Sequence, residues 1–246
     1  GAAQEIDQVG MAKPVTKRSE IILNGNQIVS NLETSYQISL SGRRGPTHLT
    51  IPTNLQSQSY DKNDMSFQSR INGPSVINTD FSHQKIIEYL KKSSNPIIIL
   101  GNGAHDVLSD EIINLVETLN IPILTEMSAR GIIPDSHYLC FGLSDQRANP
   151  IARVISESDL VILLGKELDF TLDFGNHPTI SKSSNIIQVD PDEQILSRSK
   201  RTDLSILSSV GNFVSQIVQN LNYYKVLKKS PDILKTLSYY NPFFHM

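Results

Sequence analysis

The chain has 246 residues, with 22 basic and 25 acidic side chains and a formal net charge of -3, and 39% of its residues are hydrophobic. This length and hydrophobic content suffice for one large or two ordinary domains with a proper core. The balanced charge, without a stripe of lysine and arginine among aromatic residues, argues against a nucleic-acid partner. No apolar run approaches the ~20 residues of a membrane span and no basic-then-apolar signal begins the chain, so we expect a soluble, cytoplasmic protein without membrane contact.

The single cysteine, Cys140, excludes an internal disulfide framework and fits a reducing compartment. Its neighbours in HYLCFG are largely apolar, and no recognisable motif places a histidine beside it. We therefore predict a buried, inert thiol rather than a nucleophile.

The first part of the chain has the weaker periodicity. Residues 1–17 show neither helical nor strand spacing, whereas apolar residues recur with helical spacing from Gln27 to Leu40. A short strand is expected over Thr47–Ile51, ended by Pro52. The polar segment Thr53–Ser75 has no period, and we interpret it as a linker between two domains.

A regular alternation of strands and helices follows. Ser109 is expected to cap one of the helices, without a capping box because Ile112 stands where Glu or Gln would be needed. The alternation predicts an α/β fold with a doubly wound parallel sheet covered on both faces. The predicted strands are 97–100, 121–124, 139–142, 160–164, 185–189 and 204–207, and the predicted helices are 81–92, 109–119, 150–158 and 210–221.

The stretch Asn95–Asp106 is the centre of this pattern. Four consecutive aliphatic residues, Ile97 to Leu100, run into Gly101-Asn102-Gly103, as in a buried parallel strand that turns toward a helix. The turn resembles the start of the dinucleotide fingerprint G-x-G-x-x-G, but Asp106 stands where the third glycine belongs. Nucleotide contact and a plain strand-to-helix turn both remain open.

Ligands of such sheets bind beyond the carboxyl ends of the strands, and three predicted strand ends carry suitable chemistry. The glycine turn could approach a pyrophosphate, Lys166 could supply a cation, and Asp190 could accept hydrogen bonds from ribose. The alternatives are that the glycines only turn the chain, that Lys166 and Glu167 form a solvated pair, and that Asp190 caps a helix. The six histidines have no metal-ligand spacing, so no metal residues are proposed. The candidate nucleotide-binding residues are Gly101, Asn102, Gly103, Ala104, Gly165, Lys166 and Asp190.

Several separated stretches resemble the thiamine diphosphate-dependent enzymes of the acetolactate synthase and 2-hydroxyacyl-CoA lyase type. They occur in the order of that family and span nearly the whole chain. The matching stretches are Gly1–Val9 with Lys13–Lys17, Ser41–Pro52, Pro96–Ala104, Ser158–Phe170 and Ile186–Asp190.

The resemblance implies the end of a pyrimidine-binding domain at residues 1–55, which is a partial α/β domain, and a linker at 56–78. It further implies a Rossmann-like middle domain at 79–222 and a tail toward a missing diphosphate-binding domain at 223–246. The glutamate that activates the cofactor would then precede Gly1, and the G-D-G…N signature for Mg²⁺ and diphosphate would follow Met246. We therefore expect a fragment of a larger enzyme, inactive by itself, in which Gln4 lies near the substrate channel.

The activity implied is that of a carboligase, lyase or decarboxylase acting on 2-keto acids or 2-hydroxyacyl thioesters, with thiamine diphosphate as the electron sink. The middle domain would carry FAD, or ADP or CoA, and the full-length enzyme would be a homodimer or homotetramer. Three departures from acetolactate synthases, at Ala3, Thr53 and Asp169-Phe170-Thr171, favour a less specialised relative. The rival is a non-catalytic nucleotide-binding or oligomerisation module. An NAD-dependent oxidoreductase is disfavoured by the missing third glycine.

Overall fold

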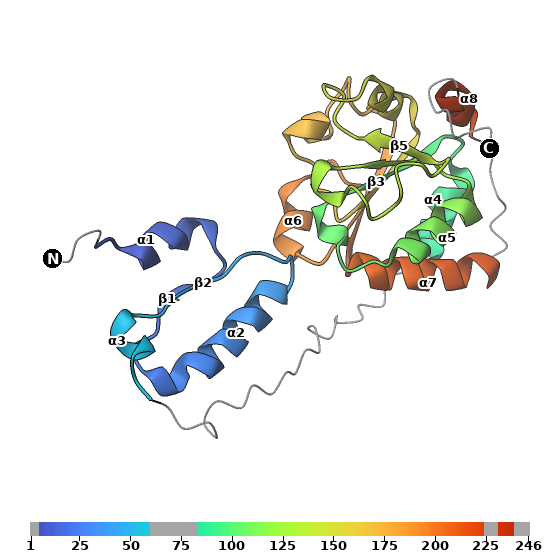
Figure 1. The fold of residues 1–246 in the computed structure, drawn as a ribbon. Helices are drawn as coiled ribbons and strands as arrows, with labels where there is room; N and C mark the ends of the chain where they lie inside the picture. Colours follow the sequence, from blue (N-terminus) through green and yellow to red (C-terminus); the bar gives the residue numbers. More distant parts are fainter. Residues whose placement is uncertain (1–4, 60–82, 224–230, 239–246) are drawn as a thin grey trace. The chain divides into compact units, whose positions relative to one another are not determined.

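The computed structural model describes residues 5–59, 83–223 and 231–238 (Figure 1). Contacts divide the chain into two compact units, Gly1–Ser75 and Val76–Met246. The boundary falls inside the predicted linker, most of which lies outside the described residues. In the described part of the chain, no helix has both the length and the apolar character needed to cross a bilayer.

The first unit is a small β-α-β arrangement. Its strands β1 (Ser19–Ile21) and β2 (His48–Thr50) pair in parallel, and α2 (Ile28–Leu40) lies between them in the sequence. The helix expected from Gln27 to Leu40 and the strand expected over Thr47–Ile51 are therefore confirmed. The sequence did not indicate β1, a strand of three residues. The remaining elements are α1 (Gln8–Ala12), the 3-10 turns η1 (Lys13–Val15) and η2 (Gly25–Gln27), and α3 (Thr53–Gln56).

Two short helices of this unit correct the sequence interpretation. Helix α1 lies in a segment without periodicity, because its five residues include no buried one and so carry no apolar pattern. Helix α3 occupies the start of the segment interpreted as linker. Pro52 precedes it in extended conformation and Leu55 is buried, which anchors this turn to the unit.

The second unit contains a six-stranded parallel sheet in the order β5-β4-β3-β6-β7-β8. The chain leaves β3 toward β4 and β5, then returns to the other side of β3 for β6, β7 and β8. Because crossovers between parallel strands are right-handed, this reversal places the connections on both faces, and the predicted doubly wound sheet is confirmed. The strands are β3 (Pro96–Leu100), β4 (Ile123–Thr125), β5 (Cys140–Leu143), β6 (Leu160–Leu164), β7 (Asn185–Asp190) and β8 (Leu204–Leu207).

Helices surround this sheet. Helix α7 contacts both α4 and α5, and α6 contacts β7 and β8. The α-helices are α4 (His83–Lys92), α5 (Ser109–Leu119), α6 (Glu193–Arg198), α7 (Val210–Tyr223) and α8 (Asp232–Ser238). The 3-10 segments are η4 (Asn102–Ala104), η5 (Met127–Ala129), η6 (Pro150–Glu157) and η7 (Phe170–Gly175). The first two residues of the helix predicted over 81–92 lie outside the described residues.

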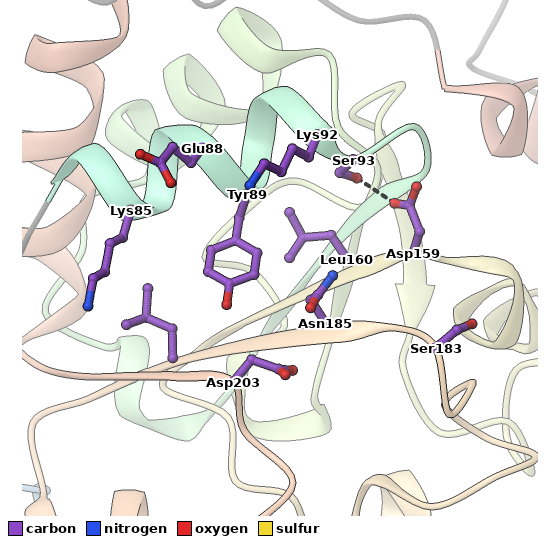
Figure 2. A pocket seen from close by; sticks show the side chains of 11 residues that line it. Lys85, Glu88, Tyr89, Lys92, Ser93, Asp159, Leu160, Ser183, Asn185 and Asp203 are labelled. Carbon is purple, nitrogen blue, oxygen red and sulfur yellow. Dashed lines mark hydrogen bonds between the residues drawn. The ribbon is translucent and has the colours of Figure 1, made fainter.

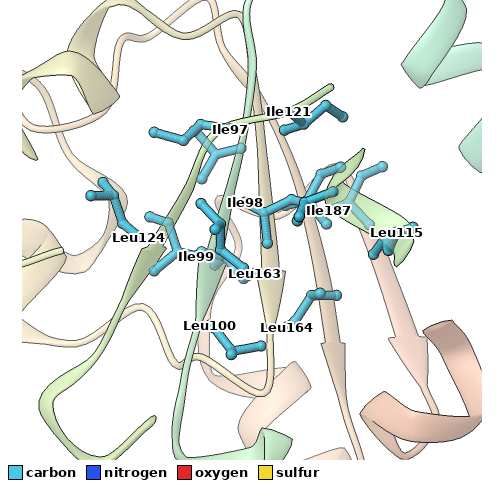
Figure 3. Packing of buried hydrophobic residues seen from close by; sticks show 14 of the residues in the cluster. Ile97, Ile98, Ile99, Leu100, Leu115, Ile121, Leu124, Leu163, Leu164 and Ile187 are labelled. Atoms are coloured by element: carbon cyan, nitrogen blue, oxygen red, sulfur yellow. The ribbon is translucent and has the colours of Figure 1, made fainter. Parts of the chain in front are cut away.

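The core centres on β3 and β6, in which every residue is buried (Figure 3). The helices add apolar faces with the expected spacing, for example Ile112, Leu115, Val116 and Leu119 of α5. Burial of one such side chain contributes about 1.5–3 kcal/mol, so the apolar runs seen in the sequence explain why this sheet forms.

Two helix predictions need correction. Ser109 does not cap α5, because the N-cap is Leu108 and the Glu111 carboxylate accepts the Leu108 N–H at 3.2 Å. Pro150–Glu157 is a 3-10 helix rather than an α-helix. Its hydrogen bonds close over three residues, from Ala152 N–H to Asn149 O at 3.0 Å and from Ser158 N–H to Ile155 O at 3.3 Å.

At the amino ends of β3 and β6, the Asp159 carboxylate holds the turn between α4 and β3. It accepts hydrogen bonds from the Ser93 hydroxyl at 2.5 Å, the Ser94 N–H at 2.6 Å and the Asn95 N–H at 3.0 Å. One side chain at the start of β6 therefore fixes the entry into β3.

Candidate functional site

The register of the sheet brings the carboxyl ends of four strands to one level. Leu100 of β3 is paired with Thr125 of β4 and with Leu164 of β6, and Leu164 is paired with Val189 of β7. The next residue along each strand therefore lies in one row, which we call the strand-end row: Gly101, Glu126, Gly165 and Asp190. Three of these four were candidates from the sequence, and Glu126 was not.

The glycines of the row bring two backbones into direct contact. The Gly103 N–H donates to the Gly165 carbonyl at 2.8 Å. A Cβ on Gly101 would lie 2.5 Å from the Lys166 Cα, and a Cβ on Gly165, whose φ is +63°, would lie 2.4 Å from the Gly103 carbonyl carbon. The glycines after β3 and β6 are required because these two turns touch each other.

Lys166 is fully buried, so the sequence-based alternative of a solvated Lys166–Glu167 pair is wrong. The Lys166 Nζ donates to Asp169 Oδ2 at 2.6 Å and lies 3.9 Å from Glu126 Oε1. Glu167 pairs instead with Arg198 at 2.7 Å. Lys166, the residue after Gly165 of the strand-end row, is thus a buried cation between two partly exposed carboxylates, of Glu126 and Asp169.

Asp169 keeps its charge in this setting. Partial burial opposes ionisation of its carboxyl, but hydrogen bonds from the Lys166 ammonium and from the Thr171 hydroxyl and N–H outweigh that effect and hold its pKa below the ordinary value. Asp169 is therefore ionised at neutral pH and compensates the buried lysine.

Asp190 is fully buried and is not a helix cap. Its Oδ1 accepts the Asp192 N–H at 3.0 Å, and Asp192 is the residue that caps α6, through the Gln194 N–H at 2.9 Å. The alternative that Asp190 caps a helix placed the cap in the correct turn, but the capping residue is Asp192. Asp190 Oδ2 lies 3.2 Å from the position that a Cβ on Gly103 would take, so Asp190 is close to the glycine turn.

Two further candidates from the sequence, Asn102 and Ala104, differ in their exposure to solvent. Asn102 is exposed and Ala104 is buried, both within η4. Gln4 lies outside the described residues.

Asp106 stands where the dinucleotide fingerprint has its third glycine, and its side chain has a structural role there. The Asp106 Oδ2 accepts the N–H of Gly211 at 3.1 Å, in the first turn of α7. A carboxylate at a helix N-terminus is favoured by the unpaired N–H groups and the helix dipole. Asp106 thus links the turn after β3 to α7, a role that a glycine cannot fill.

A pocket of about 470 Å³ lies at the other end of the sheet (Figure 2). Its walls include Lys85, Tyr89 and Lys92 of α4 and the first residues of β6, β7 and β8. Because these are amino-terminal ends of strands, the pocket is separate from the strand-end row. Of its three acidic wall residues, Glu88, Asp159 and Asp203, Asp159 accepts the hydrogen bonds of the turn between α4 and β3.

Two further kinds of reactive group are Cys140 and the possible metal ligands of the described residues. Cys140 is buried in β5, and burial raises the pKa of its thiol, as the sequence interpretation of an inert residue requires. Among the described residues, no three His, Cys, Asp or Glu side chains are grouped so that they could hold a metal ion.

The missed residue, Glu126, has a recognisable signal in retrospect. It directly follows a buried strand, as Gly101 and Gly165 do. Its Oε2 accepts the Asn102 N–H at 3.1 Å, which joins β4 to the glycine turn after β3.

These features define a Rossmann-like α/β domain with its candidate residues at the carboxyl ends of the central strands. Residues 83–217 match the family model described as "Thiamine pyrophosphate enzyme, central domain". The match covers more than half of the chain, and the chain therefore belongs to the thiamine pyrophosphate enzyme family, as the motifs of its sequence predicted.

Curated relatives extend this similarity to both units. The chain is 29% identical over 240 residues to the acetolactate synthase large subunit of Lactococcus lactis, covering 96% of this chain and 41% of that protein. It is 27% identical over 230 residues to a probable acetolactate synthase large subunit of Methanococcus aeolicus, covering 90% and 38%. Human 2-hydroxyacyl-CoA lyase 1 is 26% identical over 224 residues, again covering 90% and 38%. The chain thus spans about two fifths of the length of these relatives.

Proposed function

We propose that this chain acts within a longer thiamine diphosphate-dependent enzyme, a carboligase, lyase or decarboxylase of 2-keto acids or 2-hydroxyacyl thioesters. The match of residues 83–217 to the central domain of the thiamine pyrophosphate enzymes carries the proposal. The names of the aligned relatives, acetolactate synthase and 2-hydroxyacyl-CoA lyase, support these two substrate classes. We further propose that the whole enzyme is a cytoplasmic homodimer or homotetramer.

The thiamine diphosphate and Mg²⁺ sites are proposed to lie in the part of the enzyme that corresponds to the unaligned three fifths of the relatives. When bound, the cofactor would supply an electron sink for cleavage or formation of a carbon–carbon bond. The second unit would contribute a rigid parallel sheet, and Gln4 remains a proposed contact of the substrate channel. Contact of the middle domain with FAD, ADP or CoA also stays a prediction.

The decisive experiment uses the complete reading frame that contains this chain. With thiamine diphosphate and Mg²⁺ we expect turnover of pyruvate, or cleavage of a 2-hydroxyacyl-CoA, followed by NMR of substrate and product. Omission of either cofactor is the control, and it should abolish turnover. A full-length protein inactive on both substrate classes would contradict the proposed activity and favour the rival, a non-catalytic nucleotide-binding or oligomerisation module.

A second measurement uses the chain by itself. Titration calorimetry with thiamine diphosphate and Mg²⁺ should give no saturable heat, because the proposed sites lie elsewhere. Tight, Mg²⁺-dependent binding would overturn that placement even if the enzyme class were correct.

A further inference from the structure

A pyrophosphate held by a glycine turn needs free backbone N–H groups, and this turn has none. The Gly101 N–H donates to Leu164 O at 2.9 Å, the Gly103 N–H to Gly165 O at 2.8 Å and the Ala104 N–H to Gly101 O at 3.0 Å. The remaining one, the Asn102 N–H, donates to Glu126 Oε2 at 3.1 Å. All four donors are therefore engaged within the protein.

The space above the turn is occupied as well. In a dinucleotide site the glycines leave room for the ligand to approach the backbone. Here a Cβ on Gly101 would meet the backbone of Lys166, and a Cβ on Gly103 would lie 2.8 Å from the Gly165 Cα. The glycines make room for the neighbouring turn of the chain.

The charges beside the glycine turn also oppose phosphate binding. Two carboxylates, of Glu126 and Asp169, stand beside one buried cation, the Lys166 ammonium. Lys166 is already paired with Asp169 at 2.6 Å, and Glu126 Oε1 lies 3.9 Å from the same nitrogen. A phosphate brought here would meet two carboxylates for one cation in a partly desolvated place.

From these contacts we propose that Glu126 is an internal anion that takes the place of a nucleotide phosphate. Its carboxylate accepts the N–H that a phosphate would need and lies beside the lysine that a phosphate would need. The residues present do not fit a pyrophosphate at the glycine turn, and Glu126 is the residue that determines this specificity. The proposal concerns the central domain alone and does not depend on the thiamine diphosphate chemistry.

The test compares the wild-type chain with Glu126→Gln and Glu126→Ala, using inorganic pyrophosphate and ADP as probes. Glu126→Gln removes the charge and keeps the shape and the acceptor for Asn102, while Glu126→Ala also frees the Asn102 N–H. Glu157→Gln, at an exposed carboxylate at the end of η6, is the matched control. Affinity is measured by calorimetry, and far-UV circular dichroism checks the fold of each variant.

We expect no saturable pyrophosphate binding by the wild type or by Glu157→Gln. We expect Glu126→Ala to bind pyrophosphate at least about tenfold more tightly than the wild type does, since a like charge beside the bound phosphate costs more free energy than that ratio requires. In ¹⁵N-labelled Glu126→Ala, pyrophosphate should shift the Asn102 amide resonance, which binding elsewhere would leave in place.

Two results would overturn the proposal. The first is that the wild type binds pyrophosphate at the Asn102 amide as tightly as the Glu126 variants do. The other is two folded Glu126 variants that gain no affinity, because phosphate would then be excluded by something other than Glu126. Either result leaves the assay of the full-length enzyme unaffected, so the failure of one proposal is distinguishable from that of the other.

Discussion

Gly165 and Gly103 touch through their backbones: the Gly103 N–H donates to the Gly165 carbonyl at 2.8 Å, and a side chain on Gly165 would overlap Gly103. The contact joins the turns that follow β3 and β6, the pair at which the winding of the sheet reverses. Its tightness explains why both turns begin with glycine.

The substitution Gly165→Ala should lower the free energy of unfolding by about 2–5 kcal/mol, the sum of a left-handed residue and an overpacked contact. Gly131→Ala is the matched control, because Gly131 also has a positive φ, +89°, but has no atom within 4 Å of its added Cβ. It should lose only about 1–2 kcal/mol. Urea unfolding measures both, and equal losses would show that the close approach costs nothing.

The lowered pKa of the Asp169 carboxyl leads us to expect that the chain loses stability in acid. Its native pKa is lowered, so its contribution is fully present above the unfolded value of about 3.9 and disappears as the pH falls through the lower native pKa. Asp169→Asn should therefore be less stable than wild type near neutrality and converge with it in that acidic range. Urea midpoints as a function of pH test this expectation. A constant difference down to the lowest pH at which the chain is folded would contradict the assignment.

Removal of the carboxylate that links the glycine turn to α7 should weaken that helix. Asp106→Ala is expected to cost about 0.5–2 kcal/mol, as for a lost N-cap, whereas Asp106→Asn keeps an acceptor for the Gly211 N–H and should cost less. Hydrogen exchange of the Gly211 amide gives the local readout. Unchanged protection in Asp106→Ala would mean that the contact does not hold the helix.

The Cys140 thiol should be unreactive in the folded chain. Its side chain is buried and its pKa is raised by that burial, so little thiolate is present or accessible. We expect iodoacetamide to label the protein at the rate at which it unfolds and to label it rapidly in urea. Because the chain has one cysteine, total mass gives the result directly. Fast labelling of the native protein would contradict the buried placement.

The first unit should promote self-association. Leu23 is 78% exposed and Val15 is 71% exposed, beside a parallel sheet of only two strands. Parallel sheets are usually covered on both faces, and exposed apolar patches mark contact surfaces. Sedimentation should show a coefficient that rises with concentration and falls in Val15→Ser/Leu23→Ser. Leu108→Ser, which changes an exposed leucine of the second unit, is the control, and a wild-type monomer at high concentration would refute the expectation.

Much of the second unit could be predicted because buried parallel strands leave a strong signal. The runs that form β6 and β8 were located to the residue, whereas the strand order was not predicted and comes from the structure. The sequence did not predict α1, because none of its side chains is buried and it therefore has no apolar pattern. It also misplaced the start of α5 by one residue, since Leu108 rather than Ser109 is the N-cap.

The strand-end row could be predicted only in part. Gly101, Gly165 and Asp190 stand out because they end conspicuous aliphatic runs. The partner of Asn102 could not be found in this way, since Glu126 is 24 residues away and reaches the turn only through the pairing of β3 with β4. Sequence patterns indicated the place where chemistry should lie but could not reveal that a neighbouring side chain already fills it.

The hydrogen bond from the Ser94 N–H to the Asp159 carboxylate joins two residues that are 65 positions apart in the chain. During synthesis the middle strand of the sheet emerges long before the carboxylate that fixes its entry, and its second neighbour is complete only after Leu164. The nascent chain must therefore hold an aliphatic strand with one side unprotected while the ribosome makes the intervening residues. Chaperone binding should concentrate in that interval of translation.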